Sequence, residues 1–126
     1  MARRVCALVA LGLALLGVGP VRAVAARRPA RLLVYAQEWS LWGSRGTVPH
    51  GVVTVQLWNR GQDAHDLRIR RLTRAGHMVG GVQGVAVTLS GALSQASWHL
   101  RPGRYELYCS MPGHRAKGMH SVLVVH

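Results

Sequence analysis

The chain has 126 residues, of which 16 are basic and four are acidic, giving a formal net charge of +12 at pH 7. This length leaves room for one compact domain, and the absence of repeats and low-complexity segments excludes a repeat architecture. The positive charge favours acidic protein partners, anionic membrane surfaces or nucleic acid through electrostatic steering, and it carries no information about the fold.

Residues 1–23 have the pattern of a secretory signal peptide. A basic start precedes an apolar run, residues 5–19, which is too short to cross a bilayer as a helix, and Val21-Arg22-Ala23 supplies small residues for cleavage after Ala23. An uncleaved membrane anchor is the alternative interpretation. Arg3-Arg4 also raises the twin-arginine route, but its surroundings match a general secretory signal better. The sequence therefore predicts export to the periplasm, cell envelope or exterior.

Removal of the signal peptide changes both the charge and the cysteine count. Three basic residues leave with it, so 13 basic residues face four acidic ones and the net formal charge becomes +9. Cys6 leaves as well, and the remaining Cys109 has no partner for an intramolecular disulfide. A single thiol in an oxidising compartment is buried, paired between chains or used chemically, and metal ligation is one way to protect it as a thiolate.

The remaining chain is predicted to be a short tether, residues 24–30, followed by one folded domain, residues 31–126. Short or alternating apolar runs predict strands at 32–35, 53–57, 65–70, 85–89, 104–109 and 121–125. Turn residues occur at Asn59-Arg60-Gly61, Gly80-Gly81 and Arg101-Pro102-Gly103-Arg104. Apolar residues at helical spacing are missing, so the predicted fold is an all-β sandwich.

Two of these strands carry potential metal ligands. In the strand that begins at His65, alternation places the histidine on the apolar face shared with Leu67 and Ile69. In the strand that ends at Cys109, the same rule turns the cysteine inward with Leu107. Both side chains then lie at strand ends on inward faces, where a sandwich can bring them together.

The segment from Cys109 to Met119 has the composition of a metal-binding loop. It places a thiolate, the imidazole of His114 and a thioether five residues apart, and the proline and glycine within it allow a tight bend. Sulfur and imidazole ligands suit copper in both oxidation states, and two histidines, one cysteine and a weak axial methionine form a blue-copper electron-transfer site. His65 supplies the second imidazole, so the candidate metal ligands are His65, Cys109, His114 and Met119.

The run Cys109-Ser-Met-Pro-Gly-His114, followed by Gly118-Met119, resembles the ligand loop of azurins, auracyanins and related plastocyanin-like cupredoxins. Asn59-Arg60-Gly61 before His65 is similar to the region before the first histidine of that family. The resemblance covers about residues 31–126 and implies a Greek-key sandwich of seven to eight strands.

The same resemblance implies one copper ion held by His65, Cys109, His114 and a weak axial Met119, with His114 as the exposed edge through which electrons pass. Plastocyanins and azurins usually carry asparagine after the first histidine, where its amide links the two ligand loops. This chain has Asp66 there, and a carboxylate cannot donate that hydrogen bond.

The other histidines and the tryptophans are given structural roles. His120 is the main rival ligand, but strand alternation turns it away from the side that Met119 occupies. Four histidines match no ligand position and are predicted to be surface or structural residues: His50, His77, His99 and His126. The tryptophans are predicted to be core anchors because the chain lacks phenylalanine, with a docking surface as the alternative: Trp39, Trp42, Trp58 and Trp98.

The predicted function is one-electron transfer by an exported type 1 copper protein that is not an enzyme, and the alternative is copper carriage or storage with the same ligands. Multicopper oxidases flank the ligand cysteine with histidines, where this chain has Tyr108 and Ser110, and a dinuclear centre needs a second cysteine in the loop. The expected partner is an acidic cytochrome, oxidase or reductase. The protein is expected to be a monomer, with membrane contact only at the surface and no nucleic-acid binding.

Overall fold

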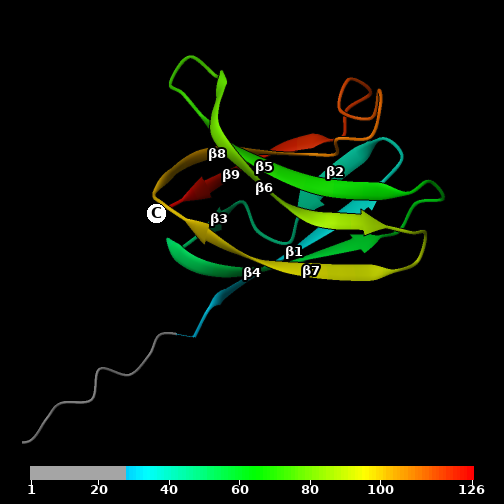
Figure 1. Cartoon of the computed structure of the whole chain (residues 1–126), viewed down its shortest axis with the longest axis horizontal. Helices are drawn as coiled ribbons and strands as arrows, with labels where there is room; N and C mark the ends of the chain where they lie inside the picture. The colour runs from blue at the N-terminus through cyan, green and yellow to red at the C-terminus, as the bar shows by residue number, and fades with distance from the viewer. Residues whose placement is uncertain (1–27) are drawn as a thin grey trace, which may run out of the picture.

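The computed structural model describes residues 28–126, so the predicted signal peptide, residues 1–23, lies outside the described residues. Residues 28–126 fold into nine strands, whose arrangement Figure 1 shows. They are β1 (Ala30–Gln37), β2 (Ser40–Gly43), β3 (Thr47–Val48), β4 (Gly51–Asn59), β5 (His65–Leu72), β6 (Met78–Thr88), β7 (Leu93–Leu100), β8 (Gly103–Tyr108) and β9 (His120–Val125).

The strands form two facing sheets. One sheet has the order β2-β1-β4-β7 and the other has the order β3-β9-β8-β5-β6. β1 runs parallel to β4 and β3 runs parallel to β9, whereas the other paired neighbours are antiparallel. The predicted all-β sandwich is confirmed. The described residues form more strands than the expected seven to eight. The short strands β2 and β3, at sheet edges, could not be recognised from the sequence because they have only four and two residues and show no extended alternation.

The core lies between the sheets and is built from aliphatic side chains. Alternation buries Val53, Val55 and Leu57 of β4 completely, and Leu67 and Ile69 of β5 face them from the second sheet. This packing compensates for the absence of phenylalanine with many leucines and valines. Within the described part of the chain, no helix is long and apolar enough to span a membrane.

The prediction that the tryptophans are core anchors is wrong for three of the four. Trp98 is buried, with its Nε1–H donating to the carbonyl of Gly84, but Trp39, Trp42 and Trp58 are 37–41% exposed. Trp42 and Trp58 occupy outward positions of β2 and β4, where both rings pack against Tyr35 of β1. Trp42 and Trp58 therefore make cross-strand aromatic contacts on the outer face of the sheet instead of packing in the core.

The turn predicted at Gly80-Gly81 is also wrong, because both glycines lie inside β6. The chain reverses earlier, between β5 and β6, where the amide of Thr73 donates to the carbonyl of His77. Gly80 has φ +76°, and the pairing of β5 with β6 is irregular at this point. The glycine pair therefore accommodates a bulge within a continuing strand.

One end of the sandwich carries the candidate ligands. β5 begins at His65 and pairs antiparallel with β8, so the start of β5 lies beside the end of β8, with Arg68 opposite Tyr108. The loop that joins β8 to β9, residues 109–119, projects from this end (orange to red at the upper right of Figure 1). The topology therefore brings His65 next to the loop that contains Cys109 and His114.

Candidate metal centre

The position of His65 depends on the turn between β4 and β5, which is held by hydrogen bonds of the Asn59 side chain. Asn59, the last residue of β4, is fully buried, and its amide Nδ2 donates to the carbonyls of Asp63, at 2.7 Å, and Thr88, at 2.9 Å. Its Oδ1 accepts from the amide of Gly61 at 2.9 Å. These three bonds fix the path of the chain immediately before His65, so Asn59 acts as more than the turn residue that the sequence predicts.

The loop from Cys109 to Met119 is closed by its own backbone. The amide of Cys109 donates to the carbonyl of Met119, and the amide of Met119 donates to the carbonyl of His114, both at 3.1 Å. The amide of His114 donates to the carbonyl of Met111 at 3.0 Å. The predicted tight bend is therefore a network that holds Cys109, His114 and Met119 in a fixed relation.

Three of the four candidate ligands meet at one point. Nδ1 of His65 lies 3.2 Å from Nδ1 of His114, and Sγ of Cys109 lies 4.0 Å and 3.6 Å from these two nitrogens. His65 and Cys109 are fully buried and His114 is half-buried. This is the cluster of metal-ligating side chains found among residues 28–126.

The distances fit one transition-metal ion. Protein sites hold such ions at about 2.0–2.1 Å from histidine nitrogen and about 2.3 Å from cysteine sulfur. Each of the three separations, 3.2, 3.6 and 4.0 Å, is shorter than the sum of the two corresponding bonds. One ion can therefore contact both nitrogens and the sulfur without rearrangement of the backbone, and the soft thiolate with two imidazoles suits copper.

Met119, the fourth candidate ligand, is joined to this cluster through its backbone. Its side chain is fully buried and belongs to the apolar core, and its main chain bonds to both Cys109 and His114. The side chain of His120, the rival ligand, is exposed instead, with Nδ1 3.6 Å from Oε1 of Glu106. The surface histidines His50, His77, His99 and His126 are exposed and lie outside the cluster.

The thiol of Cys109 is buried, and burial disfavours its charged thiolate form. Burial raises the pKa of the Cys109 thiol above its ordinary value, although amide hydrogen bonds at Met111 and Asp66 oppose this effect. A bound metal cation reverses the balance because a coordinating thiol is deprotonated. The site is thus suited to a thiolate that is stabilised by a metal ion.

Asp66 links the two ligand segments, although it cannot donate a hydrogen bond. Its fully buried carboxylate accepts hydrogen bonds from the amide of Ser110, at 2.6 Å, and from the Ser110 hydroxyl, and it pairs with Nε of Arg68 at 2.8 Å. Burial acts to raise the pKa of Asp66, but these bonds outweigh it and hold the pKa below its ordinary value. The carboxylate therefore ties β5 to the loop purely as an acceptor.

Glu38 was not among the predicted site residues, although it contacts a candidate ligand. It lies between β1 and β2, and its Oε1 is 2.9 Å from Nε2 of His65. Amide hydrogen bonds, that of Asp63 above all, lower the pKa of Glu38 to about 2. The available signal was compositional, because Glu38 is one of four acidic residues in a basic chain.

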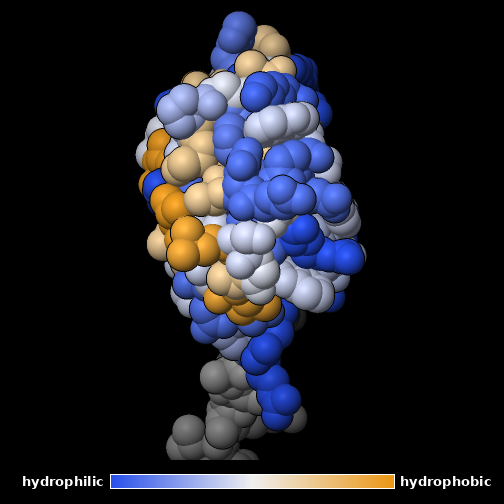
Figure 2. Space-filling model, turned by 90° about the vertical axis from the view of Figure 1, so that its right-hand side faces the viewer, coloured by the Kyte–Doolittle hydropathy of each residue, from blue (hydrophilic) through white to orange (hydrophobic). Residues whose placement is uncertain are grey.

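The surface beside the cluster is aromatic and basic. The ring of Trp39 meets the ring of His114 edge to face, with 5.0 Å between centroids, and Nζ of Lys117 lies 3.8 Å from the centroid of the Trp39 ring. Figure 2 views the molecule from the right-hand side of Figure 1, where hydrophilic residues cover one side of the surface and apolar residues collect along the other.

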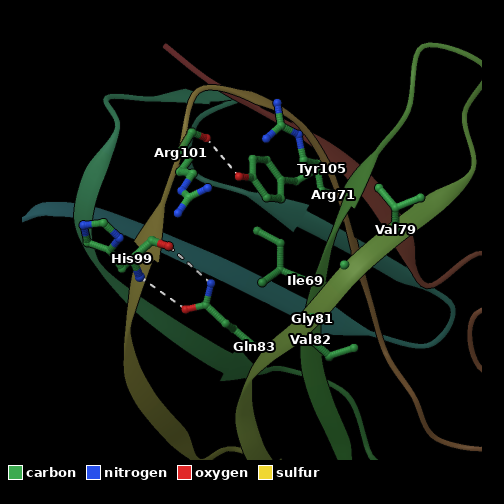
Figure 3. Close-up of a pocket in the computed structure, with 10 residues that line it drawn as sticks. Ile69, Arg71, Val79, Gly81, Val82, Gln83, His99, Arg101 and Tyr105 are labelled. Atoms are coloured by element: carbon green, nitrogen blue, oxygen red, sulfur yellow. Dashed lines mark hydrogen bonds between the residues drawn. The ribbon is translucent and has the colours of Figure 1, made fainter.

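A separate cleft of about 290 Å³ contains none of these residues. It lies along β6, between Ile69 of β5 and the β7–β8 turn, and Figure 3 shows Tyr105 between Arg71 and Arg101 at its rim. The hydroxyl of Tyr105 donates to the carbonyl of Arg101 at 2.9 Å, and Gln83 bonds to the backbone of His99. The cleft is a feature of the sandwich edge and not of the candidate metal centre.

No protein-family model matches the sequence, and no curated protein matches it. Solved structures do match the fold. Reduced auracyanin from Roseiflexus castenholzii has a TM-score of 0.63 at 20% identity, over 77% of this chain and 97% of that chain. Auracyanin A from Chloroflexus aurantiacus, described as a "blue" copper protein, has a TM-score of 0.61 at 13% identity, over 79% and 100%.

Rusticyanin from Thiobacillus ferrooxidans has a TM-score of 0.61 at 20% identity, over 80% of this chain and 79% of that chain. The chain has the cupredoxin fold. This confirms the fold that the resemblance implied, and the likeness covers 77–80% of this chain. In this cupredoxin fold, the converging side chains of His65, Cys109 and His114 lie at one end of the sandwich, where β5 begins and β8 ends.

Proposed function

We propose that this protein is a type 1 copper protein that carries single electrons between redox partners and is not an enzyme. The observation that carries the proposal is the convergence of the ligand atoms of His65, Cys109 and His114 within 4.8 Å of one another at one end of the sandwich. Auracyanin A, a structural neighbour, is described as a "blue" copper protein. Copper bound to these side chains would supply the one-electron chemistry of the Cu(I)/Cu(II) couple.

The side chains of this chain would hold the metal ion in unequal ways. His65 and His114 present Nδ1, Cys109 presents Sγ, and Met119 is proposed as the weak axial ligand because it is buried and bonded through its backbone to both loop ligands. The pinned positions of these groups suit electron transfer, since a site that does not rearrange between oxidation states keeps the barrier to transfer low.

His114 is the proposed route for electrons. It is the half-buried member of the cluster, whereas His65 and Cys109 are fully buried, so a partner approaches closest through its ring. Trp39 and Lys117 flank His114 at the surface. This arrangement combines an apolar contact with a positive charge, which suits brief docking of an electron-transfer partner.

The proposed partner is an acidic redox protein such as a cytochrome, an oxidase or a reductase. Among the described arginines, Arg68 and Arg115 form ion pairs with carboxylates, at Asp66 and Glu106, and the others have no carboxylate partner in this part of the chain. A surface of this charge accelerates association with an acidic protein in a salt-dependent way. Export to the periplasm, cell envelope or exterior follows from the signal-like pattern of residues 1–23.

The decisive experiment is the visible spectrum of the purified protein after addition of Cu(II) and then of a mild reductant. We expect an intense absorption in the red that bleaches reversibly, that is lost in Cys109→Ser and that persists in His120→Ala. A colourless protein that still binds Cu(I) would refute electron transfer at a blue site and support copper carriage. Loss of colour in both variants would require a different set of ligands.

A further inference from the structure

The turn between β1 and β2 brings a carboxylate to the back of the His65 ring. Oε1 of Glu38 lies 2.9 Å from Nε2 of His65, on the side of the ring opposite to Nδ1, which faces His114 and Cys109. The side chain of Glu38 is 24% exposed and that of His65 is fully buried. The contact is therefore formed mostly inside the protein, between residues 27 positions apart.

We propose that Glu38 is a positioning residue, which fixes the proton of His65 on Nε2 and thereby presents Nδ1 as a metal ligand. The proposal rests on the proposed function, since it concerns the same site, but the protonation of His65 can be measured without copper. In this proposal Glu38 prepares His65 for metal binding, a role that the four proposed ligands do not by themselves imply.

The direction of the hydrogen bond follows from the other contacts of Oε1. This oxygen also accepts the amide hydrogens of Gln62, at 2.9 Å, and Asp63, at 2.8 Å. Amide N–H groups are donors only, so Oε1 acts as an acceptor, and Nε2 of His65 must supply the hydrogen. A neutral imidazole carries one hydrogen, which leaves Nδ1 with a free lone pair toward Cys109 and His114.

The backbone is built to admit this carboxylate. A Cβ atom at Gly61 would lie only 2.7 Å from Cδ of Glu38 and would also collide with both carboxylate oxygens. Gly61 therefore leaves space for Glu38, and its own amide is held by Oδ1 of Asn59. The same turn that places His65 thus contains the gap and the two amide donors that hold Glu38 against the ring.

The charge of Glu38 has a predictable electronic consequence. A carboxylate that accepts the ring hydrogen increases the basicity of the ligating nitrogen and orients the ring. A negative charge near the metal also favours the more highly charged, oxidised form. Removal of this charge is therefore expected to raise the reduction potential of a copper ion at the site.

The first test uses copper-free, ¹⁵N-labelled protein and determines by NMR at neutral pH which ring nitrogen of His65 carries hydrogen. We expect hydrogen on Nε2 with slow exchange in the wild type, retention in Glu38→Gln, whose amide oxygen can still accept, and a mixture of tautomers with faster exchange in Glu38→Ala. An unprotonated Nε2 in the wild type, or an unchanged tautomer and exchange rate in Glu38→Ala, would overturn the proposal.

The second test compares reduction potentials of the copper-loaded variants. Asp63→Asn is the matched control, because it removes one negative charge from the same turn while keeping the backbone amide that bonds to Glu38. We expect a clearly higher potential in Glu38→Gln and a smaller shift in Asp63→Asn. Equal shifts in the two variants would overturn the specific role of Glu38. If the wild type failed to bind copper but carried hydrogen on Nε2 of His65, the proposed function would be refuted. The placement of the proton by Glu38 would still be supported.

Discussion

Asp66 offers a quantitative test of how the ligand segments are held together. Its replacement by alanine removes two hydrogen bonds to Ser110 and one to Arg68. Hydrogen bonds to charged groups contribute about 1.5–3 kcal/mol each. Arg68 is 37% exposed and Ser110 is exposed, so both can regain hydrogen bonds with water. We therefore expect Asp66→Ala to lower the free energy of unfolding by about 2–4 kcal/mol, less than the sum of the three bonds.

The loss should depend on pH in a defined direction. The pKa of Asp66 is lower in the folded protein than in the unfolded chain, where it is near its ordinary value of 3.8. The stabilisation by its carboxylate is fully present above the unfolded pKa and is lost as the pH falls through the folded pKa. The difference in unfolding free energy between wild type and Asp66→Ala should therefore shrink in strongly acidic solution.

The assay is urea unfolding of the copper-free protein at neutral and acid pH, with Asp63→Ala as a control that removes an exposed carboxylate three residues away. The control should change the unfolding free energy by less than about 0.5 kcal/mol at neutral pH. If Asp66→Ala were no more destabilising than Asp63→Ala, or if its effect were independent of pH, the link between β5 and the ligand loop would not be the stabilising contact inferred from the geometry.

Three further substitutions test the axial ligand and the core. Met119→Leu should keep the red absorption and raise the reduction potential, because a thioether that favours Cu(II) is lost while the side-chain volume is nearly conserved; an unchanged potential in voltammetry would count against Met119 as the axial ligand. Trp98→Ala should lower the free energy of unfolding by about 3–5 kcal/mol, since this ring is buried. Trp42→Ala, at a ring that is 41% exposed, should cost distinctly less in the same denaturant titration, and equal losses would contradict the assigned burial.

The strand pattern and the ligand loop could be predicted because both depend on local spacing. Alternation places His65 with Leu67 on the buried face of β5, and five-residue spacing places Cys109, His114 and Met119 on one loop. Ligand residues at fixed spacing can be recognised in the sequence alone. For this reason the cupredoxin resemblance was recognisable even though no family model matches the sequence.

The predictions from composition were wrong where one residue type is compatible with several local structures. The glycine pair at 80–81 fits a turn or a bulge equally well by sequence, and the pairing of β6 with β5 selects the bulge. Likewise, the lack of phenylalanine does not force tryptophan inward, because Trp42 and Trp58 gain aromatic contacts with Tyr35 across neighbouring strands.

The sequence by itself determined the class of the fold and the chemical character of the site, because strand alternation and the ligand spacing are local properties of the chain. Only the tertiary structure decided which polar groups surround His65 and the ligand loop. Glu38 reaches His65 from 27 residues away, and Asp66 reaches Ser110 across 44 positions, through pairings between strands that no local pattern specifies. Such contacts form only when the packing of the two sheets has brought these segments together.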